Sequence, residues 1–173
     1  MKSFVCKNGC CRMHTTDIVV KPDISRKRYN KKAGVFITCK DKKSKPYQYS
    51  DDDYVLLVQS YHNLWGIPKG TFEKSDENDP IRCALREVLE ETGLSLRKEN
   101  LGREYIVKDD NYFYYTTLDS VVDVPIRNEL PKFDVTSIGW FKVSCLKDFI
   151  KYKIIKLNYY TKMCFSRYFH LAL

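Results

Sequence analysis

The segment from Asp79 to Gly93 places the strongest constraint on how this chain can fold. It opens with an aspartate that can serve as an N-cap and a proline at the first helical position, and it closes on a glycine suited to the position just past a helix end. Between these signals, apolar and small residues recur at helical spacing: Ile81, Ala84, Leu85, Val88 and Thr92. The pattern predicts an amphipathic helix with one face in a core.

Three glutamates, Glu87, Glu90 and Glu91, fall within an arc of about 100° beside that apolar face. Carboxylates at this spacing repel one another, and the arginines of the segment, Arg82 and Arg86, are fewer than the glutamates. A hard divalent cation resolves the repulsion, because Mg²⁺ and Mn²⁺ prefer carboxylate oxygens. The sequence therefore predicts a magnesium or manganese site on this helix.

The stretch "REVLEETGL", together with Gly70 before it, resembles the Nudix box. That pattern is a glycine, five residues, Glu, seven residues, then Arg-Glu-apolar-x-Glu-Glu-x-Gly-apolar. Every defined position from Arg86 to Leu94 matches, but two extra residues separate Gly70 from Arg86. The early box glutamate falls on Glu77 if one residue is inserted on each side of it. The resemblance implies an α/β fold, the Nudix αβα sandwich with a mixed β-sheet between helices.

The Nudix resemblance also implies an activity and a set of roles. Members hydrolyse a nucleoside diphosphate linked to another group, and a metal-activated water addresses the high charge of a pyrophosphate bridge. In the family the matching arginine, Arg86, orients the glutamate beside it, and a backbone carbonyl at Lys69 or Gly70 often completes a metal shell. The implied catalytic residues are Arg86 and Glu87, and the implied metal ligands are Gly70, Glu87, Glu90 and Glu91.

Two further stretches bear on the substrate. "WGIPKG" is similar to the form in mRNA-decapping Nudix enzymes and dinucleoside polyphosphate hydrolases, where the lysine matching Lys69 can reach a phosphate. "RNELPKFDVTSIGWFKV" is also similar to the decapping enzymes, in which an acidic residue before a strand tryptophan acts as general base. Spacing to Trp140 favours Asp134 and residue type favours Glu129, and both stay open. The composition resembles the decapping Nudix proteins of large DNA viruses, which release 7-methyl-GDP from capped mRNA.

The net charge is +8, and the charges are unevenly distributed along the chain, with an acidic middle flanked by basic ends. Basic surface suits an RNA body, and the methylated cap base is a cation that stacks on aromatic rings. Tyr61, Trp65 and Tyr114 are candidates for that stacking. The expected RNA-binding residues are Arg26, Lys27, Arg28, Lys31, Lys32, Lys151, Lys153 and Lys156.

Two alternative functions stay open. One is another hydrolase, acting on dinucleoside polyphosphates or diphosphoinositol polyphosphates, which a basic surface also suits. The other is a non-catalytic RNA-binding Nudix domain, which the intact glutamates disfavour. In each case the expected partner is capped RNA or another polyphosphate, and the sequence does not define an oligomeric state.

Seven cysteines, an odd number, and the absence of a secretory leader favour reduced thiols. "CKNGCCRMH" brings Cys6, Cys10, Cys11 and His14 within nine residues, as in a diverged zinc knuckle. The paired C-x-x-C is missing and adjacent cysteines fit poorly around one tetrahedral ion. A packed, reduced segment is therefore favoured over Zn²⁺.

The remaining pattern predicts the layout of the chain. Residues 1–32 form a basic N-terminal extension with a weak strand signal only at 17–21, and residues 33–173 form the Nudix domain with its C-terminal helix. Strands are expected at 33–40, 53–61, on both sides of a turn at 109–111, and at 137–143. One or two helices follow Ser144, with an apolar stripe at Phe149, Tyr152, Ile155, Tyr159 and Met163. No apolar run could cross a bilayer, so we expect a soluble, cytoplasmic protein with no membrane partner, in the host cytoplasm if viral.

Overall fold

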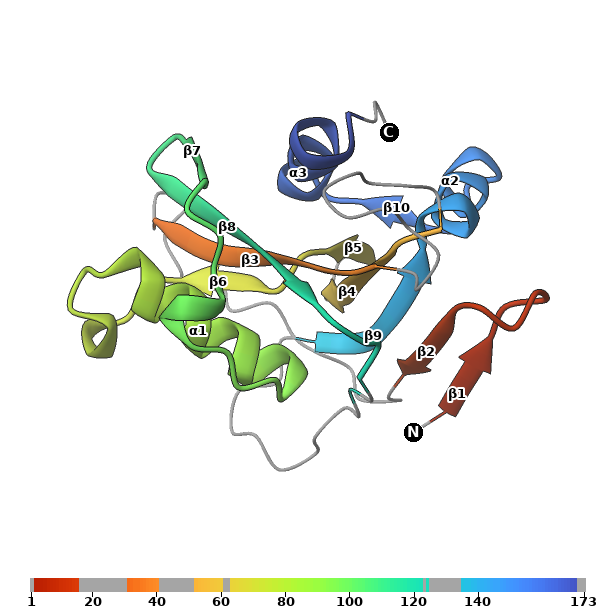
Figure 1. Cartoon of the computed structure of the whole chain (residues 1–173), viewed down its shortest axis with the longest axis horizontal. Helices are drawn as coiled ribbons and strands as arrows, with labels where there is room; N and C mark the ends of the chain where they lie inside the picture. Colours follow the sequence, from red (N-terminus) through yellow and green to blue (C-terminus); the bar gives the residue numbers. More distant parts are fainter. Residues whose placement is uncertain are drawn as a thin grey trace.

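A computed structural model describes residues 2–15, 31–40, 52–60, 63–122, 124 and 135–170. Three α-helices and ten β-strands lie in these ranges (Figure 1). The strands are β1 (Lys2–Val5), β2 (Arg12–Thr15), β3 (Lys32–Cys39), β4 (Tyr54–Ser60), β5 (Leu64–Gly66), β6 (Lys69–Thr71), β7 (Ile106–Lys108), β8 (Asn111–Leu118), β9 (Val135–Lys142) and β10 (Lys156–Leu157). The helices are α1 (Pro80–Thr92), α2 (Val143–Lys151) and α3 (Tyr159–Phe169), with short 3₁₀ turns η1 (Lys74–Asp76) and η2 (Lys98–Asn100).

The strands form one mixed sheet in the order β1-β2-β9-β4-β3-β8-β7. The pair β3 and β8 is parallel from Ala33 opposite Tyr112 to Cys39 opposite Leu118, and the other pairs along this path are antiparallel. β6 pairs with the start of β3, and β5 links β4 to β10. The predicted strands at 33–40, 53–61, 137–143 and around the turn at 109–111 are confirmed.

Helices cover both faces of the sheet, with α1 on one face and α2 and α3 on the other (Figure 1). Side chains of a strand alternate between faces, and β3 shows this directly. Val35 and Ile37 pack in the cluster under α1 with Val88, whereas Phe36 packs in the second cluster with Phe165 of α3. This arrangement confirms the predicted αβα sandwich.

The N-terminal residues form a hairpin that the sequence did not predict. β1 and β2 are antiparallel, and β2 extends the sheet by pairing with β9 from Arg12 opposite Trp140 to Thr15 opposite Ser137. All four residues of β1 are exposed, so neither face of this strand needs apolar side chains. Its sequence therefore lacks the apolar alternation by which a strand is predicted. The weak strand signal at 17–21 lies outside the described residues.

The chain closes with two helices, and β10 lies between them. The predicted single stripe is wrong at Tyr152 and Tyr159, which are 67% and 62% exposed. The break has a local cause, since Asn158 starts a new helix by accepting a hydrogen bond from the Thr161 N–H at 2.9 Å. Among the described residues, no helix has the length and apolarity to span a membrane.

Candidate active site

Helix α1 begins and ends where the sequence predicted. The Asp79 side chain accepts a hydrogen bond from the Ile81 N–H at 2.8 Å, and Gly93 ends the helix with a left-handed φ of 72°. Cys83, Ala84 and Val88 are fully buried in the cluster beneath the helix. Because this face is fixed in the core, the glutamates beside it are turned toward the loop that leads from β6 to α1.

Arg86 is the centre of a network that holds this loop on the helix. Its Nε and Nη2 donate to the two carboxylate oxygens of Asp76, each at 2.9 Å, and Nη2 also donates to the Thr71 carbonyl at 3.0 Å. Its Nη1 donates to Glu87 at 2.8 Å and to Glu90 at 3.0 Å. These acceptors match all five N–H groups of a guanidinium, so Arg86 orients two glutamates and anchors the loop.

Asp76, rather than Glu77, occupies the position of the early box carboxylate. Asp76 is 2% exposed, lies five intervening residues after Gly70, and also accepts the Glu73 N–H at 2.8 Å. Glu77 points outward to Arg82 with its side chain 71% exposed. The alignment that places Glu77 there needs one inserted residue on each side, and the inward position of Asp76 removes that need. Both extra residues then lie between Asp76 and Arg86, where Glu77 and Asn78 take positive φ values of 53° and 60°.

Strand β6 places its backbone against two of the glutamates. A β-carbon on Gly70 would lie 2.1–2.2 Å from the carboxylate atoms of Glu87, so only glycine allows this approach. One residue earlier, the Lys69 N–H donates to Glu91 Oε2 at 2.8 Å. Consecutive residues of β6 thus contact Glu87 and Glu91, while Arg86 holds Glu90.

Burial and charge set the ionisation of the network. Burial raises the pKa of Asp76, but the hydrogen bonds and charge of Arg86 and the Glu73 N–H outweigh it and leave that pKa below its ordinary value. The hydrogen bonds that Arg86 donates to Asp76, together with the negative charges of Glu87 and Glu90, raise the pKa of Arg86. Burial, with the charges of Asp76 and Glu87, raises the pKa of Cys83 to about 12, so its thiol stays protonated.

The donor set of α1 and β6 fits a hard divalent cation. It offers the carboxylates of Glu87, Glu90 and Glu91 beside the carbonyl of Gly70, and a glycine is required where Glu87 approaches the backbone. Within the part of the chain that the structure describes, these carboxylates do not form a group whose ligand atoms all lie within 4.8 Å of one another. They lie apart because Glu90 accepts a hydrogen bond from Arg86, whereas Glu91 accepts one from the Lys69 N–H.

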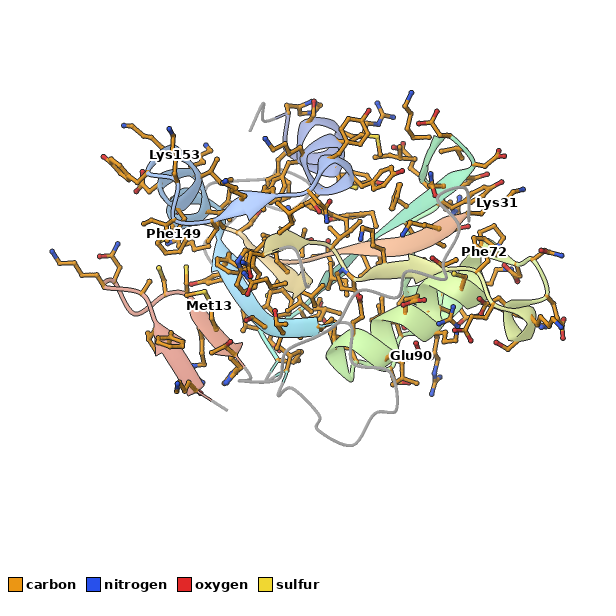
Figure 2. The ribbon with its side chains drawn as sticks, turned by 180° about the vertical axis from the view of Figure 1, so that it is seen from behind. Met13, Lys31, Phe72, Glu90, Phe149 and Lys153 are labelled. Atoms are coloured by element: carbon orange, nitrogen blue, oxygen red, sulfur yellow. The ribbon has the colours of Figure 1, made fainter. Side chains whose placement is uncertain are left out.

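The predicted basic residues divide between two places. Lys32 pairs with Thr71 of β6, beside the glutamates, and the neighbouring Lys31 is exposed. Lys151, Lys153 and Lys156 are exposed on the side of α2, and Figure 2 shows Lys153 across the molecule from Glu90. The structure therefore does not bring the two sets together. Arg26, Lys27, Arg28 and both general-base candidates, Glu129 and Asp134, lie outside the described residues.

The accessible aromatic rings near the site are not those that the sequence suggested, although one of them, Tyr105, contacts the buried Tyr114 at a centroid distance of 5.3 Å. Trp65 and Tyr114 are 5% and 6% exposed and belong to the core, and Tyr61 lies outside the described residues. Phe72, two residues past Gly70, instead contacts Tyr112, whose ring in turn contacts Tyr105, with centroid distances of 6.4 and 6.5 Å. Figure 2 shows Phe72 near Lys31 at the end of the molecule where β6 leads into α1. The sequence signal that could have found this group is the placement of Phe72 beside the box glycine.

The NUDIX domain profile matches residues 32–158, and the chain belongs to the Nudix family. It is 37% identical over 153 residues to "Putative hydrolase 111R" of Invertebrate iridescent virus 3, covering 86% of this chain and 82% of that protein. The family, this relative and the complete match of the box from Arg86 to Leu94 define a Nudix pyrophosphohydrolase.

More distant relatives are named as decapping proteins. The chain is 33% identical over 92 residues to mRNA decapping complex subunit 2 of Schizosaccharomyces pombe, but that match spans 51% of this chain and only 12% of the yeast protein. Among solved structures, a NUDIX hydrolase from Alicyclobacillus acidocaldarius aligns with a TM-score of 0.55 at 13% identity, covering 76% of this chain and 87% of the other. That likeness supports the fold alone.

Proposed function

We propose that this Nudix pyrophosphohydrolase removes the 5′ cap from messenger RNA and releases 7-methyl-GDP. The observation that carries the catalytic part is the Arg86 network, in which a buried aspartate and a guanidinium hold Glu87 and Glu90 in place. A domain that only bound RNA would have no use for carboxylates clustered at a stability cost. The decapping relatives, matched over about half of the chain, support capped RNA as the substrate.

The roles proposed for the site follow from its contacts. Glu87, Glu90, Glu91 and the Gly70 carbonyl would hold Mg²⁺ or Mn²⁺, which family members typically use. When bound, such an ion neutralises phosphate oxygens and lowers the pKa of a water. The hydrolysis joins the water oxygen to phosphorus and breaks a phosphorus–oxygen bond of the cap bridge, which leaves a 5′-monophosphate on the RNA. Arg86 acts as a positioning residue because its donors are all occupied by protein groups.

Substrate groups would be held beside the glutamates by β3 and β6. Lys31 and Lys32 lie next to Thr71, and Lys69 precedes the box glycine, so these cations are placed for phosphate oxygens. The aromatic group of Phe72, Tyr105 and Tyr112 offers ring faces for the cationic cap base, and Tyr105 is 53% exposed.

The exposed segment 151–156 would bind the RNA body rather than the cap. It interleaves Lys151, Lys153 and Lys156 with the exposed rings and chains of Tyr152 and Ile154. Lysines alternating with an aromatic ring suit a single-stranded nucleic acid, which provides both phosphates and stacking faces. Because this segment lies on the α2 layer, only an RNA long enough to pass round the domain would reach it (Figure 2).

The proposal is tested with cap-labelled RNA, a free cap dinucleotide, a dinucleoside polyphosphate and a diphosphoinositol polyphosphate, each with Mg²⁺ or Mn²⁺. Wild-type protein should release 7-methyl-GDP from long RNA, and Glu90→Gln should abolish the release. Glu99→Gln, which makes the same charge change at an exposed site in η2, should not. Turnover of either polyphosphate without turnover of RNA would contradict decapping, and RNA binding without any turnover would favour the non-catalytic alternative.

The cap-binding assignment has its own test. Tyr105→Ala should raise KM for capped RNA several-fold with little change in kcat, because it removes one stacking face outside the metal site. Tyr159→Ala removes a tyrosine of comparable exposure, 62%, on the α3 layer and serves as the matched control. Equal effects of the two variants would refute a cap-stacking role for the group.

A further inference from the structure

Four cysteines from distant parts of the chain meet at the edge of the sheet. Cys6, Cys10 and Cys11 lie in and beside the turn between β1 and β2, and Cys145 lies in the first turn of α2. Their four sulfur atoms all lie within 4.8 Å of one another. The Sγ of Cys10 is 3.4 Å from that of Cys6, 3.9 Å from that of Cys11 and 3.2 Å from that of Cys145.

These separations match a tetrahedral thiolate site. Four sulfurs at a Zn–S distance of about 2.3 Å lie about 3.8 Å apart, close to the separations around Cys10. Disulfide-bonded sulfurs would lie about 2.05 Å apart, and all four cysteines are free. Among the described residues, no other group of three or more His, Cys, Asp or Glu side chains is this compact.

The turn is shaped to present its sulfurs inward. The Gly9 N–H donates to the Cys6 carbonyl at 2.8 Å, and Gly9 takes a left-handed φ of 71°. Two backbone groups then donate to sulfur, Cys11 N–H to Cys6 Sγ and Lys142 N–H to Cys11 Sγ, each at 3.3 Å. Such donors orient ligands and offset the charge of four thiolates around one dication.

We propose that Cys6, Cys10, Cys11 and Cys145 bind one structural Zn²⁺ ion. Four sulfur ligands leave no open position, which is the property of a structural rather than a catalytic zinc site. Each thiol would lose its proton on binding, and no oxidation or reduction takes place. His14 is not the fourth ligand that the sequence suggested, because its Nδ1 lies 2.9 Å from Ser3 Oγ and it is absent from the cysteine group.

The ion would fasten the hairpin to the rest of the domain. The hairpin lies beside β9 with α2 next to it (Figure 1). Of its two strands, only β2 pairs with β9, and β1 pairs with β2. A cavity of about 380 Å³ lies on this side, lined by Gly9, Cys10, Arg12 and His14 of the hairpin and by Tyr54 and Trp140 of the sheet. A zinc ion beside Cys10 would therefore fix one wall of the cavity.

Native mass spectrometry of the full chain, purified under reducing conditions with zinc and dialysed, tests the proposal. Wild-type protein should retain one Zn²⁺ per chain, and Cys145→Ser should lose it. Cys164→Ser, which alters a fully buried thiol outside the group, should retain it. If Cys145→Ser does not fold, Cys6→Ser at the partly exposed turn replaces it.

Cobalt substitution separates this site from the glutamates of α1. Co²⁺ held by four thiolates gives a sulfur-to-metal charge-transfer band and intense tetrahedral d–d bands, whereas Co²⁺ held by carboxylates gives neither. The bands should be present in wild type and in Glu90→Gln and absent in Cys145→Ser. The proposal would be overturned if the wild-type protein stayed metal-free after reconstitution, or if it held a disulfide or iron in place of zinc. Full zinc content in Cys145→Ser would also overturn it.

Discussion

Replacing Asp76 by asparagine should both destabilise the domain and reduce its activity. The Asp76 side chain is 3% exposed and that of Arg86 is 18% exposed, so the pair is largely withdrawn from water. Asparagine keeps one acceptor but presents an NH₂ group to an arginine N–H, which leaves donor facing donor. Breaking a fully buried ion pair costs about 3–5 kcal/mol, and the partial exposure of Arg86 reduces the expected loss to about 2–4 kcal/mol.

The loss is measurable by urea denaturation and by thermal melting. For a chain of this length each kcal/mol lowers Tm by about 2–4 °C, so the shift should be roughly 4–16 °C. The decisive control is Glu77→Gln at the adjacent, exposed acid, which should change stability by less than about 0.5 kcal/mol. Equal effects of the two substitutions, or a neutral Asp76→Asn, would refute the assignment of Asp76 to the early box position.

The same pair predicts a pH dependence. Because the pKa of Asp76 is lowered in the folded state, the unfolded state binds more protons between the folded pKa and the ordinary value of 3.8. The stabilisation by Asp76 is therefore complete above about pH 5 and is lost as the pH falls through the folded pKa. The stability gap between wild type and Asp76→Asn should narrow below about pH 4, and a gap that widens on acidification would contradict the argument.

Two further substitutions test the contacts around the site. Gly70→Ala should lower kcat/KM by about 100-fold, because its methyl group would displace the Glu87 carboxylate. Gly102→Ala is the control and should be active, since its added β-carbon would lie 3.4 Å from the nearest atoms, which belong to Tyr115. Equal kinetics of the two variants would oppose a strict need for glycine at position 70. Thr161→Val keeps the side-chain volume but removes the hydroxyl that accepts a hydrogen bond from the buried Ile67 N–H at 2.9 Å. Urea denaturation should therefore show that the free energy of unfolding falls by about 1–3 kcal/mol. An unchanged midpoint would show that this N–H finds another partner.

The parts of the structure that sequence predicted are those fixed by local chemistry. Helix α1 follows from residues within one segment, since its N-cap, its apolar face and its terminal glycine all act over a few positions. The turn between β7 and β8 is also local, because Asp109 and Asp110 both take positive φ values that aspartate tolerates. In both places the local preference and the tertiary fold agree.

The assignment of Asp76 could not be made from spacing, because the two extra residues can be placed on either side of the early box carboxylate. Backbone geometry decides it. The Asp76 N–H donates to the Glu73 carbonyl and so closes η1 with the carboxylate turned inward, and Glu77 then takes a left-handed conformation that turns its side chain toward solvent. Sequence could supply the two acids but not the direction in which each one points.

The cysteine group shows how strand pairing joins what sequence keeps apart. Cys10 and Cys145 are 135 positions apart, so no local motif could link them. The register that pairs Arg12 with Trp140 carries the preceding cysteines to the end of β9, and α2 begins directly after Lys142. Cys145, in the first turn of that helix, must then face the turn of the hairpin. The sequence argued against zinc because adjacent cysteines fit poorly around one tetrahedral ion. In the structure the two side chains have different neighbours, since the Cys11 sulfur accepts a hydrogen bond from the Lys142 N–H while the Cys10 sulfur contacts Cys145. Their adjacency therefore does not exclude a shared ion.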